Sequence, residues 1–179
     1  MKRYSRTLMP TLLICLLAPA AVALAQGNPS KTADAQSDAK KAFEKLKTLA
    51  GSWEGSIMGK TVQVTIRVTA VGSAIMHDAT GQSGGPGNHE ITMMYLEGDR
   101  LLMTHYCDAG NRQRFEGKLS ADGSSVEFNL LDVAGSTERG FAKRLVFTMT
   151  DANNHVLELI YSMPDGKPVQ ARGEFRRTK

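Results

Sequence analysis

The chain has 179 residues, of which 41% are hydrophobic and 22% charged, and its formal net charge is +4. Residues 1–25 hold three of the 22 Lys and Arg residues and none of the 18 Asp and Glu residues, so the remainder has 19 against 18, or +1. Proteins that bind nucleic acids concentrate a basic surplus on one face, and this composition therefore argues against a nucleic-acid partner.

Residues 1–25 have the pattern of a secretory signal peptide. A basic start is followed by an apolar segment over residues 8–21 and by Ala-Leu-Ala at residues 23–25, a small-residue cleavage site. The apolar segment is interrupted by Pro10 and Pro19 and is shorter than the ~20 residues that span a bilayer. We therefore expect cleavage, export to the periplasm or the medium, and no stable membrane insertion.

The exported part is expected to be one domain without a disulfide. Cys107 is its single cysteine, so no intrachain disulfide can form even in an oxidising compartment. The remaining roughly 150 residues are one domain's worth and long enough to bury a core.

A flexible tether and a short helix are predicted next. Residues 26–37 are mostly Ser, Lys, Ala, Asp and Gln, a composition that does not bury enough apolar surface to fold alone. From Asp38 to Leu49, apolar residues recur every three or four positions with lysines between them. This spacing predicts an amphipathic helix whose apolar face packs on the following domain.

From residue 51 onward the hydrophobic period is two, which is typical of β-strands. In Thr61–Thr69, four β-branched apolar residues share one face while polar residues share the other. Similar segments make about ten strands. They cover residues 52–58, 61–69, 73–79, 90–96, 101–107, 112–119, 125–131, 144–150, 155–162 and 169–176.

Most connections between these strands are short turns rich in Gly, Asp or Asn, so consecutive strands are antiparallel neighbours. An open meander would leave long free edges, so residues 38–179 are predicted to form an all-β, single antiparallel up-and-down β-barrel preceded by the short helix. Two longer connections, residues 80–89 and 132–141, are candidates for a portal at the barrel rim.

The run Gly51-Ser52-Trp53 directly after a short helix resembles the start of lipocalin and fatty-acid-binding-protein barrels, the calycin group. The nearest pattern is that of nitrobindin-like and related uncharacterised lipocalin-like bacterial proteins. The resemblance implies that Trp53 closes one barrel end, packed against Arg172 or Arg176 of the last strand.

The same resemblance implies haem as a candidate cofactor, because nitrobindin-like barrels bind haem through a histidine near the carboxyl end. The final strand has no histidine, and the nearest one is His155 beside the turn at residues 151–154. A histidine beside such a turn is usually solvated. No cofactor is therefore predicted, and haem is kept as an alternative.

His105 and Cys107 share one face of a predicted strand. Their ~7 Å spacing argues against a directly bonded Cys-His nucleophilic pair. As metal ligands they would need a further donor such as His77, His89 or Asp78. A buried histidine bonded to a neighbouring group is the commoner arrangement, so no metal is predicted.

Two arginines, Arg112 and Arg114, share one face of the next strand with Glu116 and Lys118. An outer, solvated face is the simplest interpretation. If that face points inward, the arginines would hold a carboxylate or phosphate. Serine-hydrolase, zinc-protease and paired-cysteine motifs are absent from the sequence.

These observations predict an exported barrel that holds a small, largely apolar molecule in its interior and is not catalytic. One alternative is a haem- or metal-binding barrel enzyme of the nitrobindin type, and another is a structural or partner-binding module of the cell envelope. No oligomeric state is predicted. The expected ligand contacts are His77, Tyr95, His105, Tyr106, Arg114 and Tyr161.

Overall fold

The computed structural model of the protein describes residues 30–81 and 89–179. The predicted signal peptide and residues 26–29 of the predicted tether lie outside the described residues. So does most of the first predicted portal connection, residues 82–88. Within the described ranges, no helix has the length and apolarity needed to cross a membrane.

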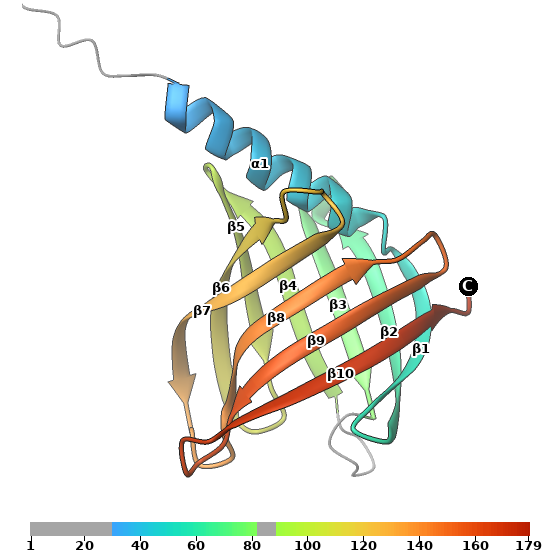
Figure 1. Ribbon diagram of the computed structural model, residues 1–179, viewed down its shortest axis with the longest axis vertical. Helices are drawn as coiled ribbons and strands as arrows, with labels where there is room; N and C mark the ends of the chain where they lie inside the picture. The colour runs from blue at the N-terminus through green and yellow to red at the C-terminus, as the bar shows by residue number, and fades with distance from the viewer. Residues whose placement is uncertain (1–29, 82–88) are drawn as a thin grey trace, which may run out of the picture.

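One helix precedes ten antiparallel strands in the described part of the chain (Figure 1). Each strand pairs with its neighbours in sequence, and β1 pairs with β10, which closes the barrel. The elements are α1 (Ser30–Lys47), β1 (Gly51–Ile57), β2 (Lys60–Thr69), the 3-10 turn η1 (Ala70–Gly72), β3 (Ala74–Thr80), β4 (His89–Glu97), β5 (Arg100–Tyr106), β6 (Asn111–Leu119), β7 (Ser125–Gly135), β8 (Phe141–Met149), β9 (Asn154–Ser162) and β10 (Pro168–Arg177).

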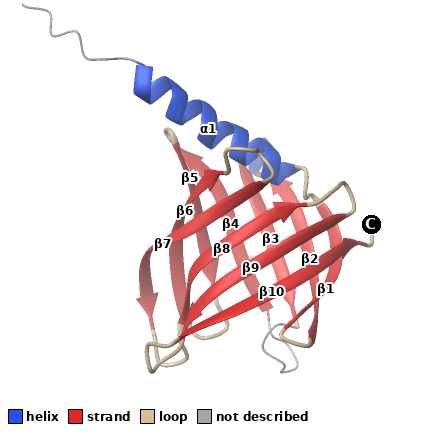
Figure 2. Cartoon of the chain, viewed as in Figure 1, coloured by secondary structure: helices blue, strands red, loops and turns tan. Residues whose placement is uncertain are grey.

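The predicted fold class is confirmed, and each predicted strand has its counterpart (Figure 2). The second predicted portal connection is shorter than expected, because β7 continues to Gly135 and β8 begins at Phe141. A register shift between Arg114 and Phe115 lets the end of β7 stay paired with the start of β6. The connection is thereby reduced to residues 136–140.

Helix α1 begins at Ser30, so residues 30–37 are helical where the sequence predicted a flexible tether. Half of these eight residues, two Ala, one Lys and one Gln, are good helix formers, which the prediction of disorder from composition did not consider. The predicted apolar face is confirmed: Ala42, Phe43 and Leu46 are buried. The helix contacts β4, β5 and β6 and lies across one end of the barrel (Figure 1).

At the same end, Trp53 is buried inside the barrel, as the sequence predicted. Its Nε1–H donates to the Leu49 carbonyl at 2.8 Å, which ties the ring to the chain between α1 and β1. The ring of His155 meets Trp53 edge-on, with centroids 4.4 Å apart, and stacks on Phe175 at 5.0 Å. Three rings from β1, β9 and β10 therefore fill this end of the interior.

The basic partner of Trp53 is Arg177, because the β1–β10 register places these two residues opposite each other. The guanidinium lies 4.1 Å from the ring centroid and donates to the carbonyls of Thr48, Ala50 and Ala152. A β-carbon at Gly51, where φ is +143°, would lie 2.2 Å from Arg177 Nη1, so this position requires glycine.

The prediction of Arg172 or Arg176 as the partner of Trp53 was wrong. Arg172 lies on the outside of β10, where it forms exposed ion pairs with Glu158 and Glu174. Arg176 is also exposed, since it alternates with the inward-facing Phe175.

His155 is buried, not solvated as the sequence predicted, and only 1% of its surface is exposed. Burial lowers its pKa to about 4, and the positive charge of Arg177 adds to the shift. Its Nδ1 has no hydrogen-bond partner within the part of the chain that the structure describes. The residue therefore acts as a neutral aromatic ring in the core.

Arg177→Ala is expected to lower the free energy of unfolding by about 2–3 kcal/mol, because it removes the cation from the Trp53 ring and three charge-assisted hydrogen bonds. Urea denaturation followed by tryptophan fluorescence measures this. The control is Arg172→Ala on the same strand, whose exposed ion pairs are worth less than about 1 kcal/mol. Equal losses in the two variants would contradict the assignment of Arg177.

His155→Phe is expected to reduce the loss of stability between pH 6.5 and pH 4. The folded-state pKa of His155 is depressed, so its stabilising contribution is complete above pH 6.5 and is lost as the pH falls towards about 4. Removing this group lowers the slope of stability against pH by up to about 1.4 kcal/mol per pH unit. Urea denaturation at stepped pH values measures the slope. The exposed His89→Asn is the control, and an unchanged slope in His155→Phe would contradict the burial argument.

Candidate functional site

A cavity of about 450 Å³ occupies the end of the barrel opposite α1. In an up-and-down barrel, alternate connections lie at the same end. The β1–β2, β5–β6, β7–β8 and β9–β10 connections supply Met58, Asp108, Arg139 and Met163 to the cavity. These four residues belong to the mouth, while the large buried rings around Trp53 close the other end.

The cavity wall has two chemically different sides. β8, β9 and β10 contribute a mostly apolar side that includes Leu145, Leu157, Leu159 and Ala171. β3, β4 and β5 contribute a polar side. Its residues are His77, Glu90, Thr92, His105 and Cys107. A guest in this space would therefore touch hydrocarbon on one side and hydrogen-bonding groups on the other.

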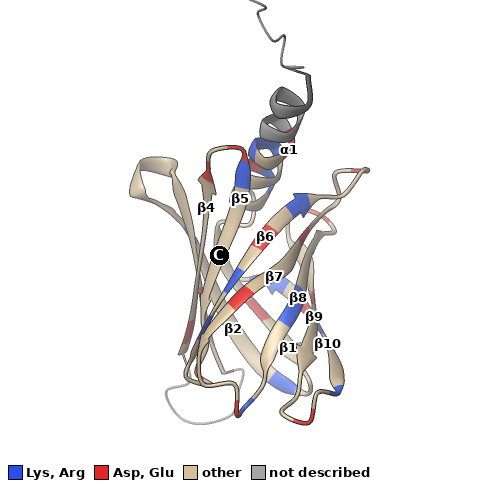
Figure 3. Cartoon of the chain, turned by 90° about the vertical axis from the view of Figure 1, so that its left-hand side faces the viewer, with Lys and Arg blue, Asp and Glu red and all other residues tan. Residues whose placement is uncertain are grey.

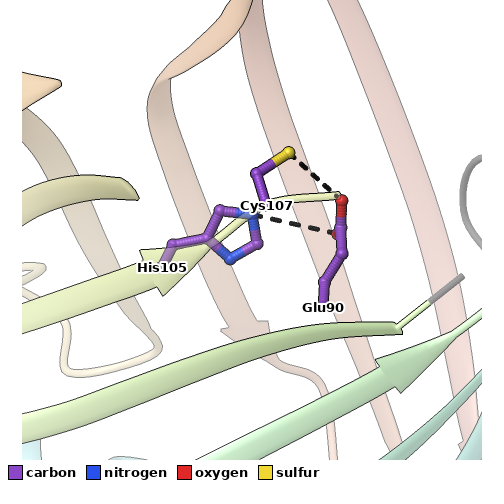
Figure 4. Close-up of side chains that lie close together, drawn as sticks. All are labelled: Glu90, His105 and Cys107. Carbon is purple, nitrogen blue, oxygen red and sulfur yellow. Dashed lines mark hydrogen bonds and ion pairs between the residues drawn. The ribbon is translucent and has the colours of Figure 1, made fainter. Parts of the chain in front are cut away.

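Glu90, His105 and Cys107 form a compact cluster on the polar side (Figure 4). The Cys107 thiol donates to Glu90 Oε1 at 3.3 Å, and His105 Nε2 lies 3.9 Å from Glu90 Oε2. One donor atom from each residue lies within 4.8 Å of the other two. On the far side of the imidazole, His105 Nδ1 is 2.8 Å from Thr92 Oγ1.

The β4–β5 hairpin creates this cluster. Its register pairs Thr92 with His105 and Ile91 with Tyr106. One further step in the same register brings Glu90 opposite Cys107, in agreement with their hydrogen bond. Because side chains alternate between the two faces of a strand, all four polar residues point into the barrel.

Burial disfavours the charged form of each group in the cluster. It raises the pKa of Glu90 to about 7 and, together with the nearby Glu90 carboxyl, raises the pKa of the Cys107 thiol to about 12. Burial also lowers the pKa values of His77 and His105 to about 4. At neutral pH the cysteine is a thiol and both imidazoles are uncharged, so no thiolate-imidazolium nucleophile forms.

Tyr161 reaches the cavity from β9. Burial is the main cause that raises the pKa of its hydroxyl, and the neighbouring Cys107 adds to the shift. His77, His105 and Tyr161 are thus the three predicted contact residues that line the cavity. Their binding of a ligand stays a prediction.

The other three predicted contact residues do not line the cavity, which is a correction. Tyr106 is 52% exposed, and Arg114 forms an ion pair with Asp132 on the outer face. Tyr95 alternates with the inward-facing Met94, and its hydroxyl lies 3.4 Å from that of Thr104. Their neighbours in sequence point inward, so strand alternation turns these side chains out.

The arginines of β6 therefore belong to the outer, solvated face, the simpler of the two sequence interpretations. Arg112 and Arg114 both pair with Asp132. Figure 3 shows Lys and Arg interspersed with Asp and Glu along the strands on this side of the barrel. Such a mixed surface agrees with the near-neutral charge of residues 26–179.

The further metal donors named from the sequence are not those of the cluster. His89 and Asp78 bond to each other, and His89 is exposed. His77 lines the cavity but does not belong to the cluster. Glu90 was missed, although the two-residue turn Gly98–Asp99 and the pairing of Glu97 with Arg100 are enough to place it opposite Cys107.

A buried amide network supports the cavity mouth at the β7–β8 connection. Gln113, with no exposed surface, accepts the Ala142 N–H at 2.9 Å and donates to Asn111 Oδ1 at 2.6 Å. Asn111 in turn donates to the carbonyls of Ser136 and Gly140. The network also satisfies the backbone where the β8–β9 register shifts after Ala142.

No family model matches the chain, and no sequence among curated proteins matches it significantly. Solved structures do match in fold. Rv2717c from M. tuberculosis has a TM-score of 0.58 and 14% identity, over 77% of this chain and 98% of that one. A DUF3598 protein of unknown function from Nostoc punctiforme PCC 73102 has a TM-score of 0.51 and 9% identity, over 73% of this chain. The match spans about half of that protein, 48% of its chain.

At these identities the likeness is one of fold. A closed, ten-stranded antiparallel barrel with one preceding helix is consistent with the lipocalin-like, or calycin, class of barrels. The fold thus agrees with the resemblance to lipocalin-like barrels noted in the sequence, while the resemblance to nitrobindin-like proteins stays a prediction.

Gln113→Leu is expected to lower the free energy of unfolding by about 2–3 kcal/mol, because the Ala142 N–H and the side-chain oxygen Oδ1 of Asn111 lose their buried partner. Amide exchange at Ala142 should also become faster. Urea denaturation and hydrogen-exchange mass spectrometry measure the two effects. Lys118→Leu, on the outward face of the same strand, should change stability by less than about 0.5 kcal/mol. Unchanged exchange at Ala142 would show that the network does not hold the mouth.

Proposed function

We propose that this protein is an exported barrel that binds a small, largely apolar molecule in its interior and does not catalyse a reaction on it. The observation that carries the proposal is the cavity of about 450 Å³, which lies in the size range of small-molecule sites. Leu, Val and Ala side chains line this interior, so replacing water there with an apolar guest lowers the free energy.

The polar side of the cavity supports orientation of the guest. His77 and Thr92 on one side and Tyr161 on the other offer hydrogen bonds to a guest that has one or two polar atoms. Apolar walls with few, convergent polar groups are typical of binding sites for small molecules. The neutral state of the imidazoles favours an uncharged polar group over a carboxylate.

Export is supported by the signal-peptide pattern of residues 1–25. A container of this kind would meet its guest outside the cytoplasm. An alternative role as a structural or partner-binding module of the envelope leaves the cavity without a use.

The arrangement of His155 favours a binding protein over a haem enzyme of the nitrobindin type. His155 is the histidine to which that resemblance points, yet it is 1% exposed and held between Trp53 and Phe175. It is also not among the described residues that line the cavity. A haem iron would reach its nitrogen only if these rings moved. A Soret band that depends on His77 or His105 after haem addition would favour the enzyme instead.

The uncharged fluorescent probe N-phenyl-1-naphthylamine is expected to bind the protein saturably, with one site per chain and an increase in its emission. Ala171→Trp places a large ring in the cavity and should weaken binding of the probe at least tenfold. Fluorescence titration measures both affinities.

The matched control is Gln170→Trp, one residue away on the outward face of the same strand, which should leave the affinity unchanged. Circular dichroism verifies that both variants are folded. The proposal is contradicted if binding of the probe does not saturate, or if the Ala171→Trp and Gln170→Trp variants bind the probe equally well. Native mass spectrometry of the protein isolated from its own host would then identify the natural guest.

A further inference from the structure

The Glu90–His105–Cys107 cluster is the feature of the interior that an apolar guest does not explain. Glu90 is buried, and His105 and Cys107 are partly buried beside it, on the polar side of the cavity wall. Removing such groups from water costs free energy unless they gain partners inside. A cluster that serves only to shape an apolar pocket could be replaced by apolar residues without that cost.

The separations within the cluster fit a single tetrahedral cation. Zinc bonds of about 2.0–2.3 Å at tetrahedral angles place neighbouring ligand atoms roughly 3.2–3.6 Å apart. The Cys107 Sγ to Glu90 Oε1 distance is 3.3 Å, and the His105 Nε2 to Glu90 Oε2 distance is 3.9 Å. The three donor atoms, all within 4.8 Å of one another, thus need only small rotations about side-chain bonds to surround one ion.

Thr92 supports His105 in the manner expected of a metal ligand. Histidines that bind a metal through one ring nitrogen usually hold the other nitrogen in a hydrogen bond, which sets the orientation of the ring. Here Nδ1 of His105 is bonded to Thr92 Oγ1 at 2.8 Å, while Nε2 faces Glu90. The hydrogen bond and the ligand set come from the same two strands, so the hairpin register positions both.

We propose that Glu90, His105 and Cys107 bind one divalent cation of the zinc class at the cavity wall, with a further coordination position open to the cavity. When the cation binds, the Cys107 thiol, and Glu90 where it is protonated, release their protons to solvent. The resulting thiolate, imidazole and carboxylate donors select zinc or cobalt over magnesium or calcium, which prefer oxygen ligands alone. Three protein ligands leave one tetrahedral position for water or for a donor atom of a guest. This proposal goes beyond the apolar container and does not depend on it.

Titration of the purified full chain with Co²⁺ tests the site, because cobalt replaces zinc in tetrahedral sites and its bond to a thiolate absorbs in the near ultraviolet. We expect one Co²⁺ per chain, a cobalt-thiolate absorption band, and loss of that band when one equivalent of Zn²⁺ is added. Cys107→Ser should abolish the band, and Glu90→Gln and His105→Asn should each weaken binding at least tenfold.

Two further variants separate ligation from general damage to the fold. Thr92→Val keeps the shape of the side chain but removes the hydrogen bond to His105, and it should weaken Co²⁺ binding about 10- to 100-fold. His89→Asn alters an exposed histidine outside the cluster and should bind Co²⁺ like the unmodified protein. Circular dichroism verifies that each variant is folded.

The proposal is overturned if the unmodified protein shows no cobalt-thiolate band, or if Co²⁺ binds equally well to Cys107→Ser, His105→Asn and the unmodified protein. It is also overturned if His89→Asn weakens binding as much as the cluster variants do. The naphthylamine titration is a separate measurement, so a negative result for Co²⁺ binding does not decide whether the cavity binds an apolar molecule.

Discussion

Pairing of β1 with β10 is the constraint on which the rest of this structure depends. An antiparallel sheet that closes has an inside and an outside, so strand alternation divides all side chains between a common interior and the solvent. The same pairing brings Trp53 to Arg177 and, through β9, to His155. Closure therefore both defines the cavity and creates the group of rings that blocks one end of it.

The two ends of the interior have opposite characters because, among the described residues, a helix covers the α1 end alone. At the α1 end, the buried face of the helix and the rings around Trp53 pack to high density. At the other end, the β1–β2, β5–β6, β7–β8 and β9–β10 connections border a space that the described side chains leave unfilled. The α1 end supplies the packed core of the barrel, and the opposite end keeps the cavity.

Polar groups inside the cavity are concentrated on the side formed by β3, β4 and β5, and electrostatics explains how they are tolerated. Burial shifts the pKa values of Glu90, His105 and Cys107 in the directions that favour uncharged forms, so His105 and Cys107 are neutral, hydrogen-bonded groups at neutral pH. The resulting cluster has no nucleophilic thiolate at neutral pH, yet its donor atoms are of the kinds that bind a cation of the zinc class.

Local patterns in the sequence were sufficient for the number of strands, their order and which side chains of a strand share a face, but not for which face points into the barrel. His105 and Cys107 could be assigned to one face because a period of two is a property of a few consecutive residues, and short turns make consecutive strands neighbours. The short turn at Gly98–Asp99 also fixes the register of the β4–β5 hairpin, so the position of Glu90 opposite Cys107 follows from local sequence.

Other features depended on residues that are distant in sequence, and only the tertiary structure decided them. The partner of Trp53 is set by the register between the first and last strands, which no turn connects, so Arg177 could not be told from Arg172 or Arg176 in advance. His155 has a polar neighbourhood in sequence, but the closed barrel places it between Trp53 and Phe175. Alternation and turns are local and can be read from the chain, whereas the contacts made by closure exist only once the two ends of the sheet have met.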